Sequence, residues 1–466
     1  MLVLGAGLAL GLAVAVLPDF LWAPLAAAVF SAGLALTNTR GAVLLAVFLV
    51  PWQIYLGNWP DSTFTFRLID FVVLAALVVS LLRHPRGGRL VFSLWLLPLI
   101  VLIGLGTLSG LLQNDLYAVG KFVVDWWPSL AFYWLMLIWA PRAWRSLLDA
   151  YLLSFALQAG LGLFQVLIGD LDVVRAALAH PAMLVFFEPD FLLERLAIGT
   201  FNFGWGGRAY AFGTYLNSAG LGVNLAAAGT AAWALALRAR RLWASRYFYV
   251  AVLLYVTCAL VLKRSGWVGM GLGFFAVLLL NLGPRRRDLQ RVILVGLLAC
   301  VVVLPIVAAR WEWLLERATD QVGWEYSRER TWPVYLSLLL QRPVLGYGPD
   351  YPTGSVEIGL AAQYGYDYNY EFGLDNSYLY LALVAGLPGL AVFLVLAAQA
   401  FGRYRLSRQP DIRVLQQAAI SGLLAYMIGG AFIVIFANLH VGGTFFLMLA
   451  LACTGVNARL VGRRRG

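Results

Sequence analysis

Long apolar runs that follow one another along the chain constrain its fold more than any other feature. Runs such as LVLGAGLALGLAVAVL, from Leu2 to Leu17, recur almost to the last residues. A helix of about 20 apolar residues crosses the roughly 30 Å hydrocarbon core of a bilayer, and most of the runs have about this length. With 62% hydrophobic and only 12% charged residues, the chain also lacks the polar side chains that would cover a soluble protein. The sequence therefore predicts an all-α polytopic membrane protein.

The hydropathy pattern predicts about 12 to 14 membrane-spanning helices, and an arrangement of about fourteen fits the loop charges best. The approximate bounds of these spans are 2–17, 20–37, 41–57, 67–83, 90–112, 118–140, 145–168, 209–237, 247–262, 265–282, 291–308, 376–401, 414–436 and 441–458.

Short connections between the spans carry most of the arginines. The clusters are Arg83, Arg86 and Arg89; Arg142 and Arg145; Arg238, Arg240, Arg241 and Arg246; Arg285, Arg286, Arg287 and Arg291; Arg403, Arg405, Arg408 and Arg413; and Arg459, Arg463, Arg464 and Arg465. Every cluster falls on the same side of the predicted arrangement. Because Lys and Arg are enriched in short cytoplasmic loops, we expect this side and both termini to be cytoplasmic. The net charge of +11 is then mainly a topology signal, and nucleic acid is not an expected partner.

The pattern divides the chain into five regions. They are N-terminal spans in 1–168, an external loop in 169–208, central spans in 209–308, a large external loop in 309–375 and C-terminal spans in 376–466. The two long loops fall opposite the basic clusters and are too apolar and aromatic for disorder, so we expect the chemistry there. Within the larger loop, SRERTWPVYLSLLLQRP is amphipathic enough to form a helix on the membrane surface.

Charged and amide side chains stand near membrane depth at three places on the loop side. These are Arg208, with Asn217 about two and a half helical turns further in; Lys263 and Arg264; and Arg328 and Arg330 in the large loop, which ends at Asp375 and Asn376. Ionisable groups at such depth are costly unless paired or solvated, so each place is a candidate functional site. Two structural explanations remain open. Isolated arginines also snorkel to the headgroups, and nearby glycines also serve helix packing.

Asp375, Asn376 and Ser377 stand directly before an apolar run. These residue types are the preferred N-caps of helices, so the triplet fits a cap as well as a catalytic group. The tyrosines of QYGYDYNYEF, which are Tyr364, Tyr366, Tyr368 and Tyr370, fit either a sugar-binding platform or an interfacial aromatic belt. No histidine has a second ligand at metal spacing, so no metal site is expected.

The motifs of the central spans resemble those of the O-antigen ligases and Wzy-type polysaccharide polymerases. In RAYAFGTYLNSAG, Arg208, Gly213, Thr214 and Asn217 stand at spacings similar to the Arg, Gly-Thr-Phe and Pro-Asn of that family. The stretch KRSGW, which contains Arg264, is similar to the Ser-Arg-Gly-Ala-Trp stretch that follows, with the serine displaced.

Later motifs extend the resemblance to about residues 208–400. RERTW supplies an Arg before a Trp, RPVLGYG a Pro-x-x-Gly-x-Gly turn, DNSYLYL an Asp-Asn pair before Tyr-Leu, and AGLPG a Gly-Leu-x-Gly. Ligases of the family carry His where this chain has Asp375, and an Asp-Asn pair is more similar to the polymerising members. The resemblance therefore favours a polymerase over a ligase.

The resemblance implies an integral-membrane glycosyltransferase with a GT-C-like fold and one large external loop between late helices. Such an enzyme transfers glycan from a polyprenyl-pyrophosphate-linked donor to a glycan or lipid-linked acceptor, with membrane lipid around it. The site would face the periplasm or exterior of the cytoplasmic (inner) membrane of a bacterium. No metal or other cofactor is implied, and the oligomeric state stays open.

The resemblance also implies roles for individual residues. Arg208 and Arg264, with Arg328 or Arg330 as a third cation, would bind the donor pyrophosphate, because a guanidinium binds phosphate oxygens bidentately. Asp375 would accept the proton of the acceptor hydroxyl, with Asn376 orienting it, and one displacement would invert the anomeric carbon.

Two other classes remain as alternatives. A flippase or other transporter for the same lipid-linked glycan would also need many spans and charged residues within the membrane, although it would be expected to show paired repeats that this sequence lacks. A non-catalytic assembly or scaffold protein is the other alternative.

Overall fold

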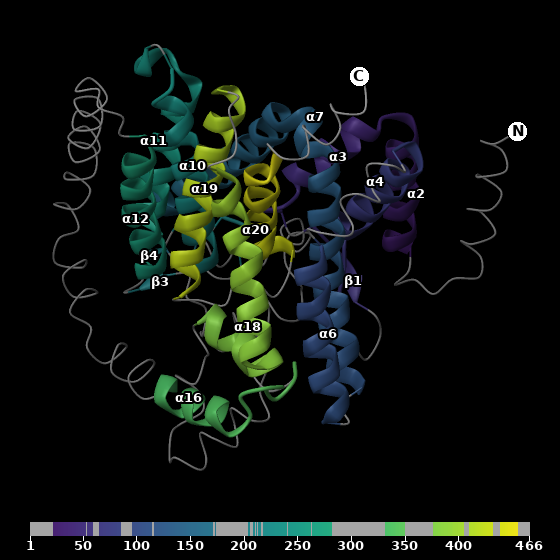
Figure 1. The fold of residues 1–466 in the computed structure, drawn as a ribbon. Helices are drawn as coiled ribbons and strands as arrows, with labels where there is room; N and C mark the ends of the chain where they lie inside the picture. Colours follow the sequence, from purple (N-terminus) through teal and green to yellow (C-terminus); the bar gives the residue numbers. More distant parts are fainter. Residues whose placement is uncertain are drawn as a thin grey trace, which may run out of the picture.

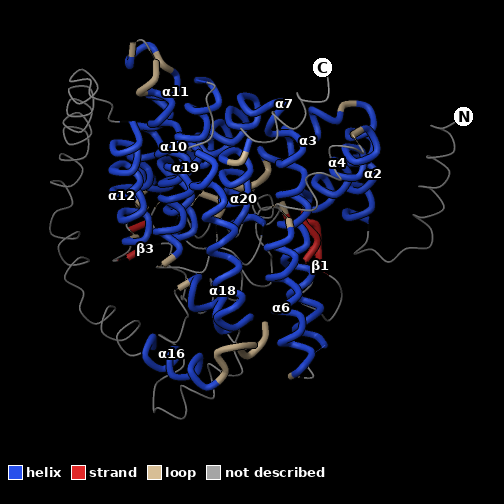
Figure 2. The backbone as a smooth tube through the Cα atoms, in the orientation of Figure 1, coloured by secondary structure: helices blue, strands red, loops and turns tan. Residues whose placement is uncertain are grey.

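The computed structural model describes residues 22–52, 54–58, 65–84, 96–113, 116–170, 173, 204–205, 208–209, 211, 213–215, 218–239, 241–261, 263–281, 331–349, 376–404, 410–431 and 439–454. Within these ranges the fold is all-α apart from two short hairpins and one 3-10 turn, η3 (Leu242–Ala244), before α11 (Figures 1 and 2). The α-helices are α2 (Trp22–Thr37), α3 (Thr39–Phe48), α4 (Leu68–Arg83), α6 (Leu97–Leu112), α7 (Leu116–Ile168), α10 (Ser218–Ala236), α11 (Arg246–Leu260), α12 (Arg264–Asn281), α16 (Thr331–Gln341), α18 (Ser377–Tyr404), α19 (Pro410–Gly430) and α20 (Leu439–Ala452).

The two hairpins are antiparallel pairs at the ends of helices. Strand β1 (Tyr55–Asn58) pairs with β2 (Thr65–Arg67), which leads directly into α4. Strand β3 (Gly204–Trp205) pairs with β4 (Arg208–Ala209), with Trp205 opposite Arg208. Sequence reasoning predicted no strands at these places, because two to four residues are too few for a periodic pattern.

Several helices have the length and composition of membrane spans. Four helical segments of the described residues are long and apolar enough to cross a membrane. They are Phe122–Ile168, Ser218–Ala236, Ser377–Phe401 and Asp411–Gly430, and the described residues also include shorter apolar helices. The predicted all-α, multi-pass membrane protein is therefore confirmed. The number of about fourteen spans stays a prediction, because several predicted spans lie outside the described residues.

Helix α7 consists of two arms rather than one straight rod. Its 53 residues would extend about 80 Å as a single helix, far more than a bilayer needs. The backbone leaves helical geometry at Ala143, with φ −139° and ψ 23°, two residues after Pro141. The arms on either side correspond to the predicted spans 118–140 and 145–168.

Small residues let the central helices approach closely. Helix α10 is buried along almost its whole length and packs against α11, α12 and α19. A Cβ added at Gly266 of α12 would lie 3.1 Å from the backbone of Gly222 in α10, and one at Gly269 would lie 2.8 Å from the carbonyl oxygen of Ala425 in α19. The glycines that follow Arg264 therefore serve helix packing, one of the two explanations that the sequence left open.

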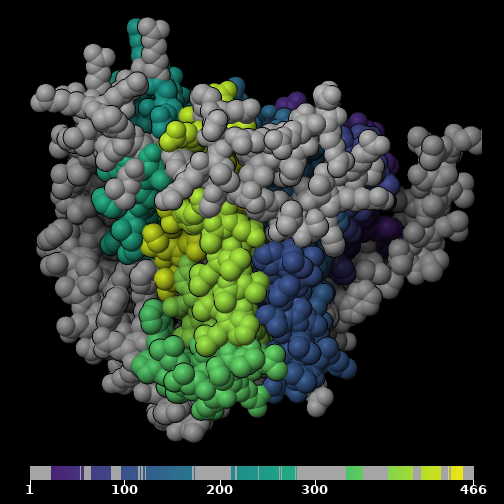
Figure 3. Space-filling view, viewed as in Figure 1, coloured from purple at the N-terminus to yellow at the C-terminus, as the bar shows by residue number. Residues whose placement is uncertain are grey.

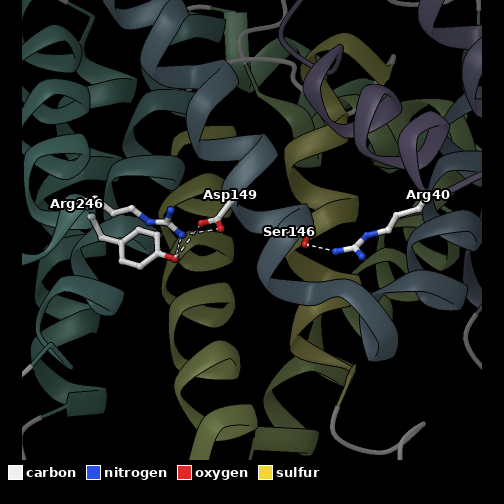
Figure 4. Close-up of polar contacts among 5 residues, drawn as sticks. Arg40, Ser146, Asp149 and Arg246 are labelled. Carbon is white, nitrogen blue, oxygen red and sulfur yellow. Dashed lines mark hydrogen bonds and ion pairs between the residues drawn. The ribbon is translucent and has the colours of Figure 1, made fainter. Parts of the chain in front are cut away.

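Arginines tie helix ends together at one face, which we call the arginine face. Arg83, which ends α4, donates to Thr39 Oγ1 at 2.6 Å, and Arg238, just after α10, donates to Gln417 Oε1 of α19 at 2.7 Å. Figure 4 shows Arg40 donating to Ser146, and Arg246 paired with Asp149 at 2.7 Å. Arginines from two of the predicted clusters, together with Arg40, therefore lie at one face of the fold.

The opposite end of the bundle is the loop face, where β3–β4 lies and where α10 and α12 begin. Helix α18 lies beside α6, and α16 lies below the outer end of α18 (Figures 1 and 3). The helix expected within residues 327–343 is thus present as α16, from Thr331 to Gln341.

Candidate functional site

The segment that carries Arg208 is a hairpin and a turn, not the start of a helix. Arg208 lies in β4, Gly213 has a left-handed φ of +61°, and α10 begins only at Ser218. The expectation that Arg208 and Asn217 lie two and a half turns apart on one helix is therefore wrong. The cause is local: the glycine at 213 leaves helical geometry, which favours a turn ahead of the helix. The Arg208 side chain lies outside what the structure describes.

Two glutamines of α7 hold this turn, and we call the arrangement the glutamine dock (Gln158, Gln165, Gly213 and Thr214). Gln165 accepts from the Gly213 N–H at 2.8 Å and donates to the Gly213 carbonyl at 2.8 Å. Gln158 accepts from the Thr214 N–H at 2.9 Å and donates to the Thr214 hydroxyl at 2.7 Å. Both glutamines are buried. The dock satisfies the backbone of an irregular segment at a place where water is excluded.

A backbone contact brings the two arginine-bearing segments together. The Ala211 N–H donates to the Leu260 carbonyl at 3.4 Å, at the end of α11. Gly162 of α7 makes room on the same side, because a Cβ there would lie 3.1 Å from that of Ala211. Helix α12 then begins at Arg264, whose side chain is not described. The segment that follows Arg208 and the segment that precedes Arg264 are therefore neighbours through Ala211 and Leu260.

Asn376 is the N-cap of α18. Its Oδ1 accepts from the backbone N–H groups of Tyr378 at 2.9 Å and Leu379 at 3.0 Å. The capping alternative is thus realised by Asn376, which satisfies two of the amides that a helix start leaves free. Asp375 lies outside the described residues, as do Arg328, Arg330 and the four tyrosines Tyr364, Tyr366, Tyr368 and Tyr370.

Helix α19 links the start of α18 with the helix that follows the glutamine dock. Tyr378 of α18 donates to the Met427 carbonyl of α19 at 2.6 Å. Two residues further along α19, a Cβ added at Gly429 would lie 2.6 Å from the Val223 side chain of α10. The helix that Asn376 caps and the helix that follows the dock therefore contact the same stretch of α19.

A second irregular segment docks on α18, and we call this arrangement the clasp (Pro343–Pro349 with Leu383–Leu387). Helix α18 breaks at Gly386, which has φ +70° and ψ 178°. In an unbroken helix the Leu387 N–H would bond to the Leu383 carbonyl. Here the Leu387 N–H donates to the Pro343 carbonyl at 2.8 Å, and the Leu383 carbonyl accepts from the Tyr347 N–H at 2.6 Å. The turn RPVLGYG thus supplies the hydrogen bonds that the motif AGLPG gives up.

The clasp also fixes α16 and α6. Tyr347 donates its hydroxyl to the Leu338 carbonyl at 3.1 Å, and its ring lies 4.9 Å from the Arg342 guanidinium. On the other side, a Cβ at Gly348 would lie 3.0 Å from the Cα of Gly110. The segment Pro343–Pro349 of the large loop is therefore bound both to α6 and to the helix that Asn376 caps.

Sequence reasoning did not single out Gln158 and Gln165. Their signal was two amide side chains seven residues apart, on one face of an otherwise apolar span. Among the described residues, no group of three His, Cys, Asp or Glu side chains could hold a metal ion.

Fold and site together define a multi-pass membrane protein whose irregular, hydrogen-bonded motifs meet at one face. Residues 249–394, about a third of the chain, match the sequence model of the O-antigen ligase family. This segment of the chain therefore carries the domain of the family that the motif order resembles. A search among curated proteins gave no match.

Proposed function

We propose that this protein is a glycosyltransferase that polymerises or ligates polyprenyl-pyrophosphate-linked glycan repeat units, with polymerisation favoured because Asp375 stands where ligases carry His. The observation that carries the proposal is that α18, which Asn376 caps, and α10, which follows Thr214, contact the same stretch of α19, at Met427 and Gly429. The match to the O-antigen ligase family supports the same reaction class. The site would face the outside of a bacterial inner membrane, opposite the arginine face, since basic loops stay in the cytoplasm.

The proposed reaction is a single displacement. The acceptor hydroxyl oxygen attacks the anomeric carbon of the donor sugar, the bond from that carbon to the pyrophosphate oxygen breaks, and the polyprenyl pyrophosphate leaves with the electron pair. Asp375 takes the proton of the attacking hydroxyl, and the configuration at the anomeric carbon inverts. The step needs no oxidant, and no metal is invoked.

Guanidinium groups would stabilise the departing pyrophosphate. Arg208 and Arg264 belong to backbone segments joined by the bond from Ala211 to Leu260, which supports their acting on one group. Arg328 or Arg330 would contribute a third cation from the large loop. Charge-assisted bonds from a planar fork to phosphate oxygens are among the stronger hydrogen bonds in proteins, so lysine is not an equivalent replacement.

Asn376 would act on Asp375 through position rather than through chemistry. Its Oδ1 is engaged by Tyr378 and Leu379, which holds the start of α18 in place beside Asp375. The tyrosines Tyr364, Tyr366, Tyr368 and Tyr370 are proposed to bind sugar rings, with an interfacial belt as the alternative.

Replacement of the base tests the proposal. Because Asn cannot accept the proton, Asp375→Asn is expected to lower the rate of glycan transfer by roughly 10² to 10⁴ while the melting temperature stays close to wild type. Transfer is measured on the purified protein with a lipid-linked donor. A near-normal rate would reduce Asp375 to a structural residue and remove the proposed mechanism.

The same assay separates a transferase from a flippase. Detergent solution contains no bilayer to cross, so a transporter would form no product, whereas a transferase forms a longer or newly attached glycan. Offering a second lipid-linked repeat unit or a different lipid-anchored oligosaccharide as acceptor distinguishes polymerase from ligase. Absence of product with either acceptor, from protein that retains its fold, would favour the transporter.

A further inference from the structure

We infer that Gln158 and Gln165 are positioning residues for the donor site, which they serve by fixing the segment that presents Arg208. The inference rests on the proposed role of Arg208 in binding pyrophosphate. Both side chains lie outside the segment that matches the O-antigen ligase family. The evidence for the inference is the set of hydrogen bonds in the glutamine dock.

The dock is a two-point contact at each glutamine. Gln165 meets both the N–H and the carbonyl of Gly213, each at 2.8 Å, as a neighbouring strand would. Gln158 meets the N–H and the hydroxyl of Thr214, and donates also to the Pro51 carbonyl at 3.1 Å. The Thr214 hydroxyl donates to the same Pro51 carbonyl at 3.0 Å. Two-point contacts fix orientation as well as distance.

Glutamine is suited to this task by its chemistry. The backbone amides of a regular helix are already used within the helix, so only side chains of α7 can bond to a docked segment. A primary amide offers a donor and an acceptor in one plane, which a hydroxyl, a carboxylate or an aliphatic group does not. Gln158 and Gln165 lie two turns apart on one face, with Gly162 between them to admit Ala211.

The shape of the turn at Gly213 also fits the side chain of Gln158. Gly213 has φ +61°, which L side chains rarely adopt, and a Cβ there would overlap Gln158 Oε1. The chain at this point therefore has little freedom to shift along α7.

The glutamine dock restricts the position of the backbone at Arg208. Arg208 lies five residues before Gly213, at the end of a hairpin whose exit is held by the bond from Ala211 to Leu260. Loosening the dock would let β4 move relative to the start of α12, where Arg264 lies. Two guanidiniums that must meet one pyrophosphate are sensitive to such a shift, since misplacement by about 1 Å can cost about 10² in rate.

The experiment measures KM for the lipid-pyrophosphate donor, KM for the acceptor, kcat and melting temperature in purified variants. Gln165→Leu is expected to raise the donor KM at least about 10-fold with little change in the acceptor KM. Gln416→Leu is the matched control: Gln416 is a buried glutamine of α19 that donates to the Ala452 carbonyl at 3.0 Å, near the arginine face. It is expected to lower the melting temperature without changing the donor KM.

A conservative variant tests rescue and guards against a folding defect. A protonated carboxyl has the donor and acceptor of an amide, so Gln165→Glu is expected to keep a donor KM within about 3-fold of wild type while the new carboxyl is neutral. The donor KM should rise as the pH passes above the pKa of that carboxyl, because the ionised form loses its donor to Gly213. A donor KM that does not depend on pH beyond the wild-type profile would contradict the inference.

A double-mutant cycle separates this inference from the proposed function. In an Arg208→Ala background, Gln165→Leu is expected to raise the donor KM no further, because the group it positions is gone. A raised donor KM in Arg208→Ala beside an unchanged one in Gln165→Leu would overturn only the positioning role. An unchanged donor KM in Arg208→Ala would instead overturn the donor role of Arg208, on which the inference depends.

Discussion

The glutamine dock and the clasp both hold an irregular segment against a predicted membrane helix, and they do so in opposite ways. In the dock α7 stays regular, and side-chain amides of Gln158 and Gln165 bond to the turn. In the clasp α18 breaks at Gly386, and backbone groups of Leu383 and Leu387 bond to the turn. Where a helix is intact its backbone is occupied, so the contact depends on side-chain identity. Where a helix is opened, the contact depends on glycine.

The difference predicts which substitutions each region tolerates. A backbone contact leaves no flexible group to move aside, whereas an amide side chain can rotate away at a moderate cost. Four predictions, in order of decreasing effect, test this contrast.

Gly386→Ala is expected to have the largest effect. A Cβ there would overlap the Val344 carbonyl oxygen, and the left-handed φ of +70° is unfavourable for alanine. Strain and overpacking together should lower the free energy of unfolding by about 3 kcal/mol or more. Thermal or denaturant unfolding of the purified variant and the wild type measures this loss of unfolding free energy. Gly104→Ala on α6, where no atom would lie within 4 Å of the new Cβ, is the control and should be neutral or slightly stabilising.

Gly213→Ala is expected to cost less, about 1 to 2 kcal/mol, although its φ of +61° is similar. The atom that its Cβ would meet is the end of a flexible side chain, Gln158 Oε1, rather than a backbone carbonyl. Unfolding of Gly213→Ala in a Gln158→Ala background measures the coupling, and part of the cost of Gly213→Ala should disappear there. If the losses of unfolding free energy in the two single variants simply added up in the double variant, the Gln158 side chain would not be the group that the new Cβ at position 213 displaces. The proposed contrast between dock and clasp would then be wrong.

Asn376→Ala should cost about 1 kcal/mol of folding free energy, within the usual range of about 0.5 to 2 for an N-cap. The short arm of α18 loses two hydrogen bonds at its start but keeps the clasp at its other end. Asn376→Asp retains a capping oxygen and should stay close to wild type in melting temperature. A large loss in both variants would show that the amide nitrogen of Asn376, rather than the cap, matters for folding.

Arg145→Ala is expected to have the smallest effect. Its ion pair with Asp411 spans 3.1 Å, but the side chains are 65% and 76% exposed at the arginine face. Exposed pairs contribute about 0 to 1 kcal/mol, and salt screens them. Unfolding at low and high ionic strength measures this contribution, which should vanish at high salt. A loss as large as that of Gly213→Ala would mean that the arginine face contributes to stability as much as the dock does.

Much of the fold could be predicted from the sequence because its signals are local. Apolar runs predicted the helices, and the basic residues near Arg83, Arg145 and Arg238 share one face in the fold as their spacing predicted. The start of α18 after Asn376 and the presence of α16 followed in the same way from caps and periodicity. The site was predicted less well: Arg208 lies in a strand, and the glutamines that anchor its segment were not identified.

What the sequence by itself determined is which segments are helices within a membrane, because hydropathy and charge act over about 20 neighbouring residues. The tertiary structure decided where those helices break and what fills the breaks. Gln158 meets Thr214 across 56 positions of the chain, and the motifs RPVLGYG and AGLPG become one structure only when α18 opens. Whether a backbone group is satisfied depends on the partner that packing brings to it, and no local pattern records that partner.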